Sequence, residues 1–366
     1  MGFCPQGHAQ KYLIQKIKLK NLKIYPKTTM DLNIIWFVLV GVLLTGYAIL
    51  DGFDLGVGSL HLFAKGDRER RILLNSIGPV WDGNEVWLVT GGGALFAAFP
   101  HVYASVFSAF YDAFMLLLLV LIFRAISIEF RSKYPSPTWR KTWDIAFSIS
   151  SYLIALLAGV ALGNIVIGVP LDKNHELHTN VLNLLTPYTV LVGITTVALF
   201  MMHGAIYLLM KTEGEIQARV RVWVQNAMIF FIMCYVSLSM VTLLYVPRMA
   251  DKFREQPLFF LVAVVNMFAI ANIPREITKN RPGYAFISSS VNILCLMSLF
   301  AIGLFPNLVP AVDPANSLTI YNAASSPKTL SIMLIFALLG VPVVLAYTIS
   351  IYWIYRGKVK LDEMSY

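Results

Sequence analysis

Residues 34–58 read IIWFVLVGVLLTGYAILDGFDLGVG, an apolar run that ends in a stretch with two aspartates and three glycines. About 20 apolar residues cross a bilayer as a helix. In lipid the backbone must satisfy its own hydrogen bonds, so such runs form helices. The sequence therefore predicts an all-α membrane protein with about nine transmembrane helices. The other predicted spans are 76–99, 102–124, 144–168, 187–210, 222–246, 257–273, 284–306 and 329–355.

The composition agrees with a polytopic membrane protein. Hydrophobic residues make up 57% and charged residues 13%, with a mean hydropathy of +0.68. A soluble domain carries about 25% charged residues. In a soluble protein, the net charge of +9 would suggest nucleic-acid binding. Here the basic residues lie in short segments between apolar runs, which indicates anionic lipids and membrane topology. We expect no nucleic-acid partner.

Basic residues are concentrated in the loops that follow the odd-numbered spans and in the C-terminal segment. The positive-inside rule predicts a cytoplasmic C-terminus and, with nine spans, an N-terminus outside. Residues 1–29 are rich in lysine, which conflicts with an N-terminus outside the cell. They also lack the apolar core of a signal peptide. We interpret 1–29 as an upstream extension from a misassigned start, with Met30 as the true one. Residues 30–366 then form a single membrane domain.

Five carboxylates stand out in the predicted spans: Asp51, Asp54, Asp82, Glu85 and Asp112. A charge at the bilayer centre costs about 3 kcal/mol or more, so such residues indicate function by default. Asp51 and Asp54 are three apart on one helix face, as are Asp82 and Glu85. At 1.5 Å per residue, Asp82 is predicted roughly 10 Å from the cytoplasmic end, and Asp112 roughly 15 Å from the outer end. Together these five carboxylates predict a proton-uptake path from the cytoplasm to the middle of the membrane.

A structural interpretation stays open for each of these groups. Asp51, Asp54, Asp82 and Glu85 could pair with a basic residue or cap a helix break beside a glycine. Asp112 has no cation nearby in the sequence and could face a partner subunit. For Arg124 and Glu129, near the inner end of the third span, we expect an interfacial pair or charges that extend to the membrane surface. The glycine pairs Gly52/Gly56 and Gly159/Gly163 predict close helix approach.

The histidines bear on haem binding. A haem b needs axial His or Met ligands inside the helical bundle. Only His203 lies well inside a span, and Met201 and Met202 beside it are typical of packing. One interior histidine cannot anchor a multi-haem site. The sequence also lacks nucleotide, hydrolase and metalloprotease motifs. Nothing in it indicates that the chain is a catalyst alone.

Three stretches carry a resemblance to a known family: LDGFDLGVG at 50–58, GPVWDGNEVWLVTGGGALFAAFPHVYA at 78–104 and FRAISIEFRSK at 123–133. In this order they resemble subunit II of cytochrome bd-type quinol oxidases. The resemblance is strong over residues 30–135 and rests on span count, length and topology beyond that. It implies two four-helix bundles plus one peripheral helix. It also implies a partner, subunit I, that carries the haems (b and d), oxidises quinol and reduces dioxygen to water.

The resemblance further implies what this chain would do. It would bind no haem itself, support assembly of the haem sites, and bring protons through Asp51, Asp54 and Asp82 in an inner membrane, contributing to proton-motive force. Glu85 matches the cyanide-insensitive branch, whereas other members carry Gln there. Asp112 matches no part of the family pattern. Trp81 and Trp87 flank the acidic pair and suit either a structural quinone or simple packing. A small third subunit is left open.

Two other functions compete with this interpretation. A proton- or cation-coupled transporter would also carry intramembrane carboxylates and Gly-rich broken helices. It would work without a partner, and its two halves would be related, which the sequence does not show. A pure scaffold would use the buried charges only to contact subunit I. Neutralising Asp82 separates a scaffold, which loses the complex, from a proton path, which keeps the complex and loses turnover.

Overall fold

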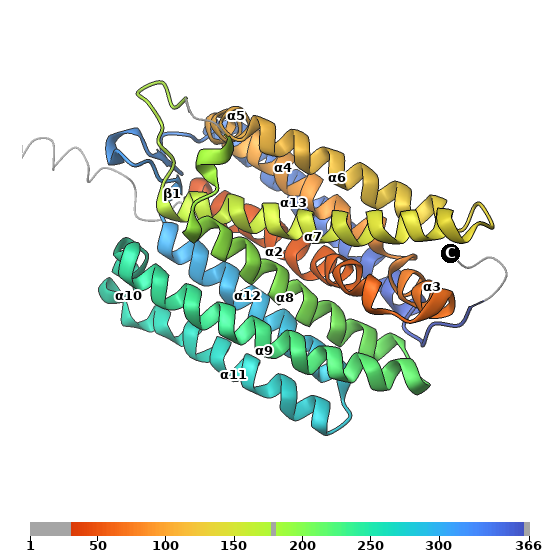
Figure 1. Ribbon diagram of the computed structural model, residues 1–366. Helices are drawn as coiled ribbons and strands as arrows, with labels where there is room; N and C mark the ends of the chain where they lie inside the picture. Colours follow the sequence, from red (N-terminus) through yellow and green to blue (C-terminus); the bar gives the residue numbers. More distant parts are fainter. Residues whose placement is uncertain (1–30, 177–180, 362–366) are drawn as a thin grey trace, which may run out of the picture.

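The computed structural model describes residues 31–176 and 181–361. This part of the chain is almost entirely helical, as the apolar runs predict (Figure 1). Its α-helices are α2 (Leu32–Leu60), α3 (Gly66–Ile77), α4 (Trp81–Ala98), α5 (Pro100–Ala109), α6 (Tyr111–Phe130), α7 (Pro137–Ile167), α8 (Pro187–Lys211), α9 (Gly214–Tyr245), α10 (Asp251–Glu255), α11 (Phe260–Thr278), α12 (Pro282–Leu304) and α13 (Pro327–Ile354).

The shorter elements lie between these helices. The 3₁₀ helices are η1 (His61–Phe63), η2 (Val181–Leu184), η3 (Pro247–Ala250), η4 (Pro257–Phe259) and η5 (Pro314–Asn316). The strands β1 (Asn307–Val309) and β2 (Leu318–Thr319) pair antiparallel between α12 and α13. Residues 1–29, predicted to be an extension, lie outside the described residues.

Eight helices in the described ranges are long and apolar enough to cross a membrane: α2 with η1, α6, α7, α8, α9, α11 with η4, α12 and α13. Helix α4 takes the place of the second predicted span. Its 18 residues correspond to about 27 Å at 1.5 Å per residue. It runs antiparallel to α2, since Asn84 contacts Leu50 near the start of α4 and Gly91 lies against Leu44 farther along. The protein is an integral, multi-pass membrane protein.

Helix α2 lies at the centre of the packing. On one side α2 contacts α4 and α7, and α6 packs on α7. On the other side α2 contacts α8 and α12. Helix α9 packs on α8, and α11 packs on α12. Helix α13 packs on α2 and α4 from outside and is largely exposed (Figure 1). These contacts group α2, α4, α6 and α7 on one side, group α8, α9, α11 and α12 on the other, and leave α13 peripheral.

Glycines allow the close approach at the centre. A Cβ added at Gly56 would lie 1.9 Å from the Phe200 carbonyl oxygen, so only glycine fits where α2 crosses α8. A Cβ at Gly159 would lie 2.7 Å from the Cα of Gly193, which brings α7 equally close to α8. Both predicted glycine pairs, Gly52/Gly56 and Gly159/Gly163, face α8 atoms within contact distance. The prediction of close helix approach is confirmed.

Several helices begin at a Ser or Thr followed by proline. The side chains of Ser136, Thr186 and Ser326 accept a hydrogen bond from a backbone N–H in the first turn of α7, α8 and α13. Proline follows each of them at the first helical position, where its missing N–H costs nothing. Local sequence thus sets where these spans start.

The third predicted span was wrong in its placement. The apolar run 102–124 is divided between a short helix, α5, and the long helix α6, with a break at Phe110. The backbone of Phe110 has φ −108° and ψ 25°, outside the helical region. Hydropathy does not detect such a break because both sides of it are apolar.

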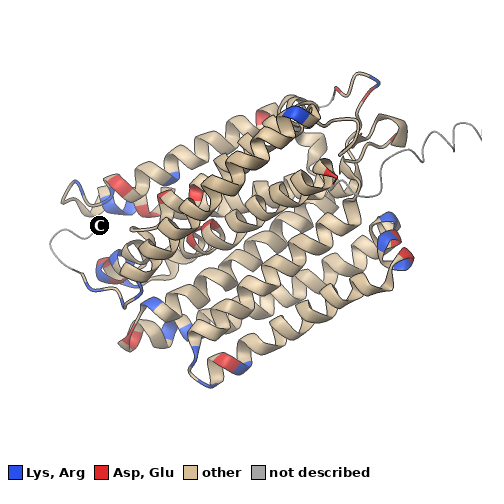
Figure 2. Ribbon diagram, turned by 180° about the vertical axis from the view of Figure 1, so that it is seen from behind, with Lys and Arg blue, Asp and Glu red and all other residues tan. Residues whose placement is uncertain are grey.

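Charged residues divide unevenly between the two ends of the helices. Figure 2 shows Lys and Arg concentrated toward the end of the helices at which α13 ends, while the helix middles carry few charges. This end, called the basic end below, includes the segments 61–75, 131–141, 211–221, 275–281 and 355–361. The grouping agrees with the loop assignment on which the predicted topology depends.

Candidate functional site

A buried ion pair joins α2 to α6. Arg124 donates two hydrogen bonds to the Asp51 carboxylate, from Nη1 to Oδ2 at 3.1 Å and from Nη2 to Oδ1 at 2.5 Å. Both side chains are completely buried. The two-pronged geometry fits the planar guanidinium to the carboxylate and is the strong form of this interaction. Asp51 is therefore paired with a buried cation.

Arg124 also has other neighbours. Its Nη1 lies 3.6 Å from Oε2 of Glu85, whose side chain is partly exposed. The Trp81 ring lies 5.9 Å from the guanidinium carbon, within the range of a cation–π contact. The buried Tyr47 precedes Asp51 by one turn of α2. Arg124 is thus the centre of an assembly of side chains from α2, α4 and α6.

Asp54 has a different environment. Its Oδ2 accepts a hydrogen bond from Nδ2 of Asn84 at 2.7 Å, and the same amide reaches the Leu50 carbonyl at 3.3 Å. The Asn84 oxygen in turn accepts from the Tyr352 hydroxyl of α13 at 2.8 Å. The other oxygen of Asp54, Oδ1, has no partner among the described residues. No cation contacts Asp54 there, so it can exchange a proton without breaking an ion pair.

Local sequence explains how α4 reaches these carboxylates. Gly46 faces the Trp87 ring so closely that a Cβ there would lie 2.3 Å from Cε3 of the indole. Trp87 therefore packs on α2, and the preceding turn of α4 brings Asn84 to Asp54 and Glu85 to Arg124. Of the predicted α4 pair, only Glu85 lies near the α2 carboxylates, where it approaches Arg124 at 3.6 Å.

The interpretation of Arg124 as a charge at the membrane surface was wrong. Its side chain is fully buried and it holds Asp51. Sequence reasoning also missed Asn84 and Tyr352, which connect Asp54 to α4 and α13. One signal could have indicated Arg124. It is a cation within the apolar helix α6 and has no acidic residue one turn away on that helix, so its partner must come from another helix such as α2. No local signal indicates Tyr352, because α13 carries other hydroxyl side chains and nothing in the sequence distinguishes this one.

Two predicted carboxylates lie away from this cluster. Asp112 is exposed in the first turn of α6, since that helix begins at Tyr111. Its predicted place near mid-span was therefore wrong, and the depth argument for it fails. Asp82 is exposed in the first turn of α4, two residues before Asn84. It has no hydrogen bond or ion pair within the described chain.

Trp81 and Trp87 make contacts that packing alone explains. Trp81 is nearly buried and lies beside Arg124, while Trp87 fills the space over Gly46. Both indoles thus have neighbours within the chain.

Two buried histidines, His203 and His61, bond neighbouring groups within the chain. His203 is fully buried, with Nδ1 against Ser289 Oγ at 2.6 Å and Nε2 against the Ile49 carbonyl at 3.0 Å. Its ring also stacks on Phe286. His61 directs Nε2 at Asp144 Oδ1, 2.6 Å away. Within the described ranges, no group of three or more His, Cys, Asp or Glu side chains is arranged to hold a metal ion.

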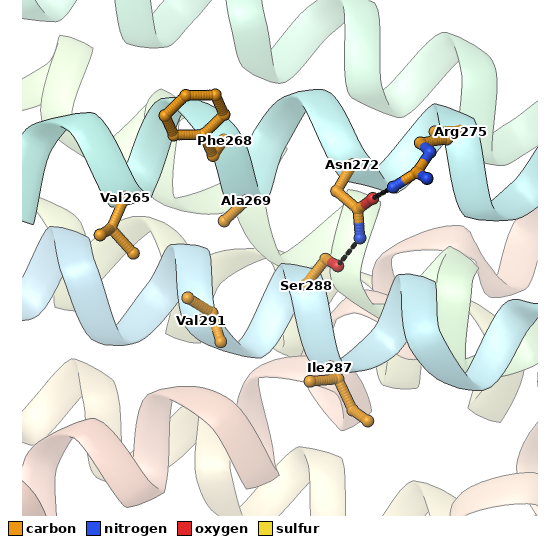
Figure 3. A pocket seen from close by; sticks show the side chains of 8 residues that line it. All are labelled: Val265, Phe268, Ala269, Asn272, Arg275, Ile287, Ser288 and Val291. Atoms are coloured by element: carbon orange, nitrogen blue, oxygen red, sulfur yellow. Dashed lines mark hydrogen bonds between the residues drawn. The ribbon is translucent and has the colours of Figure 1, made fainter.

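A groove of about 410 Å³ lies between α11 and α12 (Figure 3). Its polar side chains already bond one another: Asn272 Nδ2 donates to Ser288 Oγ at 2.9 Å, and Arg275 Nη1 donates to Asn272 Oδ1 at 3.1 Å. The rest of its lining is apolar. None of the predicted site residues lines this groove, so the carboxylates around α2 remain the candidate site.

Comparisons with known proteins agree with this architecture. The family model described as cytochrome bd terminal oxidase subunit II matches residues 32–355. Subunit 2 of the cytochrome bd-I ubiquinol oxidase of Escherichia coli K12 is 36% identical over 91% of this chain and 96% of its own length. Subunit 2 of the cytochrome bd ubiquinol oxidase of Bacillus subtilis is 34% identical over 91% of this chain and 98% of its own.

A solved structure, that of the bd oxidase from Geobacillus thermodenitrificans, superposes with a TM-score of 0.73 at 18% identity, covering 89% of this chain and 98% of the matched chain. This likeness shows a shared fold. The family match and the curated relatives cover almost the whole described chain. The chain therefore belongs to the cytochrome bd terminal oxidase subunit II family and is an integral membrane subunit of a bd oxidase complex, which implies haem and a first subunit in that complex.

Proposed function

We propose that this chain is the haem-free subunit II of a quinol:dioxygen oxidoreductase in an inner (cytoplasmic) membrane. It supports assembly of the haem-bearing subunit I and takes up protons from the cytoplasm. The curated relatives in Escherichia coli and Bacillus subtilis are named as subunits of ubiquinol oxidases. The haems of subunit I supply electron transfer and oxygen reduction, and quinol is the substrate of the complex. Membership in this family favours the oxidase over a transporter.

The environment of Asp54 carries the proton-uptake proposal. Reduction of dioxygen to water consumes protons, which must cross part of the membrane. Asp54 is completely buried and is bonded by a neutral amide, whereas Asp51 beside it is fixed by Arg124. A buried carboxyl group next to a permanent ion pair can gain and lose a proton while its surroundings stay in place. Glu85, partly exposed on α4, lies 3.6 Å from Arg124 and one turn from Asp82 along its helix.

The outward face of α4 supports a contact with subunit I. Asp82 is exposed there, and lipid is a poor environment for a carboxylate. A Cβ at Gly92 or Gly93 would meet no atom of the described chain within 4 Å. Small residues at a helix surface let another helix approach closely. We place subunit I on this face, where Asp82 and Glu85 would lie at the junction of the two subunits.

The test uses the whole complex, purified in mild detergent from its native host. Haem b and haem d signals with a larger co-purifying subunit are expected, and a colourless, partner-free chain would contradict the assignment. In Asp54→Asn and Asp82→Asn variants we expect the haem spectrum to remain and quinol oxidase turnover to fall. Asp251→Asn, an exposed carboxylate in α10, is the control and keeps turnover.

The outcomes separate the two roles. Loss of the assembled complex in both variants would leave only the scaffold role. Normal turnover with normal haem content would remove these residues from the proton path.

A further inference from the structure

The groove between α11 and α12 lies in the group of helices that does not contain α4. Helix α11 packs on α12 and forms the edge of that group (Figure 1). The apolar lining comes from both helices, with Val265 and Phe268 on α11 and Ile287 and Val291 on α12. Val265, Phe268 and Ile287 are exposed. Because the chain is an integral membrane protein, an apolar groove at this edge is open to the lipid.

The length of the groove matches one leaflet of a bilayer. Its lining extends along α11 from Val265 to Arg275, ten residues apart, which is about 15 Å along a helix. Half of the hydrocarbon core of a bilayer is also about 15 Å thick. Helix α11 ends at Thr278, at the basic end, so Arg275 lies one turn from the end of the span and Val265 lies deeper. The groove can therefore take the acyl chain of a lipid from one leaflet.

Free hydrogen-bond donors lie at the end of the groove near Arg275 (Figure 3). Arg275 Nη1 donates to Asn272 Oδ1 at 3.1 Å, and its Nε and Nη2 make no hydrogen bond within the described residues. Asn272 Nδ2 has two hydrogens and uses one of them on Ser288 Oγ at 2.9 Å. A guanidinium pairs well with a phosphate. Arg275 thus suits a lipid phosphate, and Asn272, one turn deeper, suits an ester carbonyl.

The loop that joins α11 to α12 makes this end of the groove cationic. Lys279 and Arg281 are exposed, and their side chains make no hydrogen bond or ion pair in the part of the chain that the structure describes. The carboxylate of the segment 275–281 belongs to Glu276, and it lies 3.8 Å from Arg275, beyond hydrogen-bond distance. Basic pockets between membrane helices bind anionic headgroups. The excess of cations therefore favours an anionic lipid over a neutral lipid or a quinone.

We propose that the groove binds one anionic phospholipid, with its phosphate on Arg275, an ester carbonyl at Asn272 and an acyl chain along Val265 and Phe268. The positive-inside rule assigns the basic end to the cytoplasmic leaflet, where anionic lipids attract clustered Lys and Arg. The acyl chain lies between α11 and α12, so binding stabilises the packing of these two helices. The site lies apart from the carboxylates of α2 and does not depend on the proposed proton uptake.

The test uses the complete complex, purified in mild detergent and depleted of native lipid. Phosphatidylglycerol is added in one series and neutral phosphatidylcholine in another, and native mass spectrometry counts the lipid molecules that remain bound. We expect one phosphatidylglycerol to bind before the weaker ones, and phosphatidylcholine to show no such preferred molecule. Haem content, measured on the same samples, checks that each complex is intact.

Three charge variants test the phosphate contact. Arg275→Gln should weaken binding of the preferred phosphatidylglycerol by about tenfold or more, because it removes hydrogen bonds from a charged donor. Arg254→Gln, which changes an exposed cation of α10, is the control and should keep the wild-type affinity. Glu276→Gln should bind at least as tightly as the wild type, because it removes the carboxylate beside Arg275.

A matched pair of variants tests the acyl-chain contact without changing any charge. Val265 and Val264 are exposed neighbours on α11, but of the two only Val265 lines the groove. The indole of Val265→Trp would fill the groove, so this complex should lose the preferred phosphatidylglycerol. Val264→Trp should keep it. The two contacts are tested independently, so either one decides if a variant of the other fails to assemble.

Three outcomes would overturn the proposal. Equal affinity of wild type and Arg275→Gln for phosphatidylglycerol would mean that the cation plays no part. Equal binding of phosphatidylglycerol and phosphatidylcholine would mean that the groove does not select an anion. A co-purifying quinone that Val265→Trp displaces and Arg275→Gln retains would assign the groove to a neutral ligand. These measurements do not use turnover, so their failure would leave the proposed proton uptake untouched.

Discussion

Arg124 of α6 donates hydrogen bonds to Asp51 of α2 from both terminal nitrogens, at 2.5 and 3.1 Å, and both side chains are completely buried. Asp54, one turn later, has no such cation among the described residues. The two aspartates therefore have different surroundings although they lie on the same helix face. Asp51 is held in an ion pair inside the helical packing, and the proton exchange proposed for Asp54 would break no ion pair.

We expect Arg124→Gln to destabilise the complex by about 3–5 kcal/mol, because it leaves the Asp51 carboxylate buried and unpaired. Thermal dissociation of the purified complex measures this. Arg124→Lys should recover only part of the loss, since an ammonium group cannot make the two-pronged contact. The double variant Asp51→Asn/Arg124→Gln should be more stable than Arg124→Gln alone. Equal stability of the two would contradict a direct pairing.

Asp51→Asn and Asp54→Asn should differ strongly in stability. The first removes the partner of a buried guanidinium, leaving it only the Glu85 carboxylate at 3.6 Å. The second keeps an oxygen that can accept from Asn84, so its cost stays within about 1.5 kcal/mol, the net value of one hydrogen bond. We expect Asp54→Asn to assemble normally and Asp51→Asn to dissociate at a clearly lower temperature. The reverse order would show that Asp54, not Asp51, carries the structural charge.

Gly56→Ala should prevent α2 from packing on α8. The added Cβ would lie 1.9 Å from the Phe200 carbonyl oxygen and 3.0 Å from the Gly204 Cα, both backbone atoms that cannot move aside. We expect little or no assembled complex in the membrane fraction. Gly41→Ala is the control on the same helix, because its Cβ meets no described atom within 4 Å. Equal yields from the two variants would mean that α2 and α8 can separate without harm.

The sequence predicted α2 well, as 34–58 against Leu32–Leu60, because one apolar run is bounded by polar residues at both ends. It also predicted which residues share a helix face, since spacing within one helix determines that. The break at Phe110 escaped prediction because it depends on backbone angles between two apolar segments. That error alone moved Asp112 from a supposed mid-span position to the first turn of α6.

The spacing of residues in the sequence could not predict which side chains pair between different helices. Asp51 and Arg124 are 73 residues apart, and Asp54 and Asn84 are 30 apart. Their pairing follows from how α2, α4 and α6 pack, for which glycines such as Gly46 are the only local indication. The sequence therefore identified the carboxylates of α2 and α4 but not the arginine and asparagine that give Asp51 and Asp54 their different surroundings.

Asp144 should be the most sensitive acidic residue at the basic end. It is almost fully buried and accepts from Arg131 at 2.5 Å and from Arg70 at 3.0 Å, with His61 at 2.6 Å. Asp144→Asn leaves the buried Arg131 with only the half-exposed Asp67, so we expect a loss of about 3–5 kcal/mol in thermal dissociation experiments. Asp67→Asn removes a half-exposed carboxylate and leaves Arg131 paired with Asp144, so it should cost within about 1 kcal/mol. The loss of stability in Asp144→Asn should persist in high salt, because salt screens a buried ion pair only slightly. If Asp144→Asn and Asp67→Asn lose equal stability, Asp144 is not the centre of this cluster.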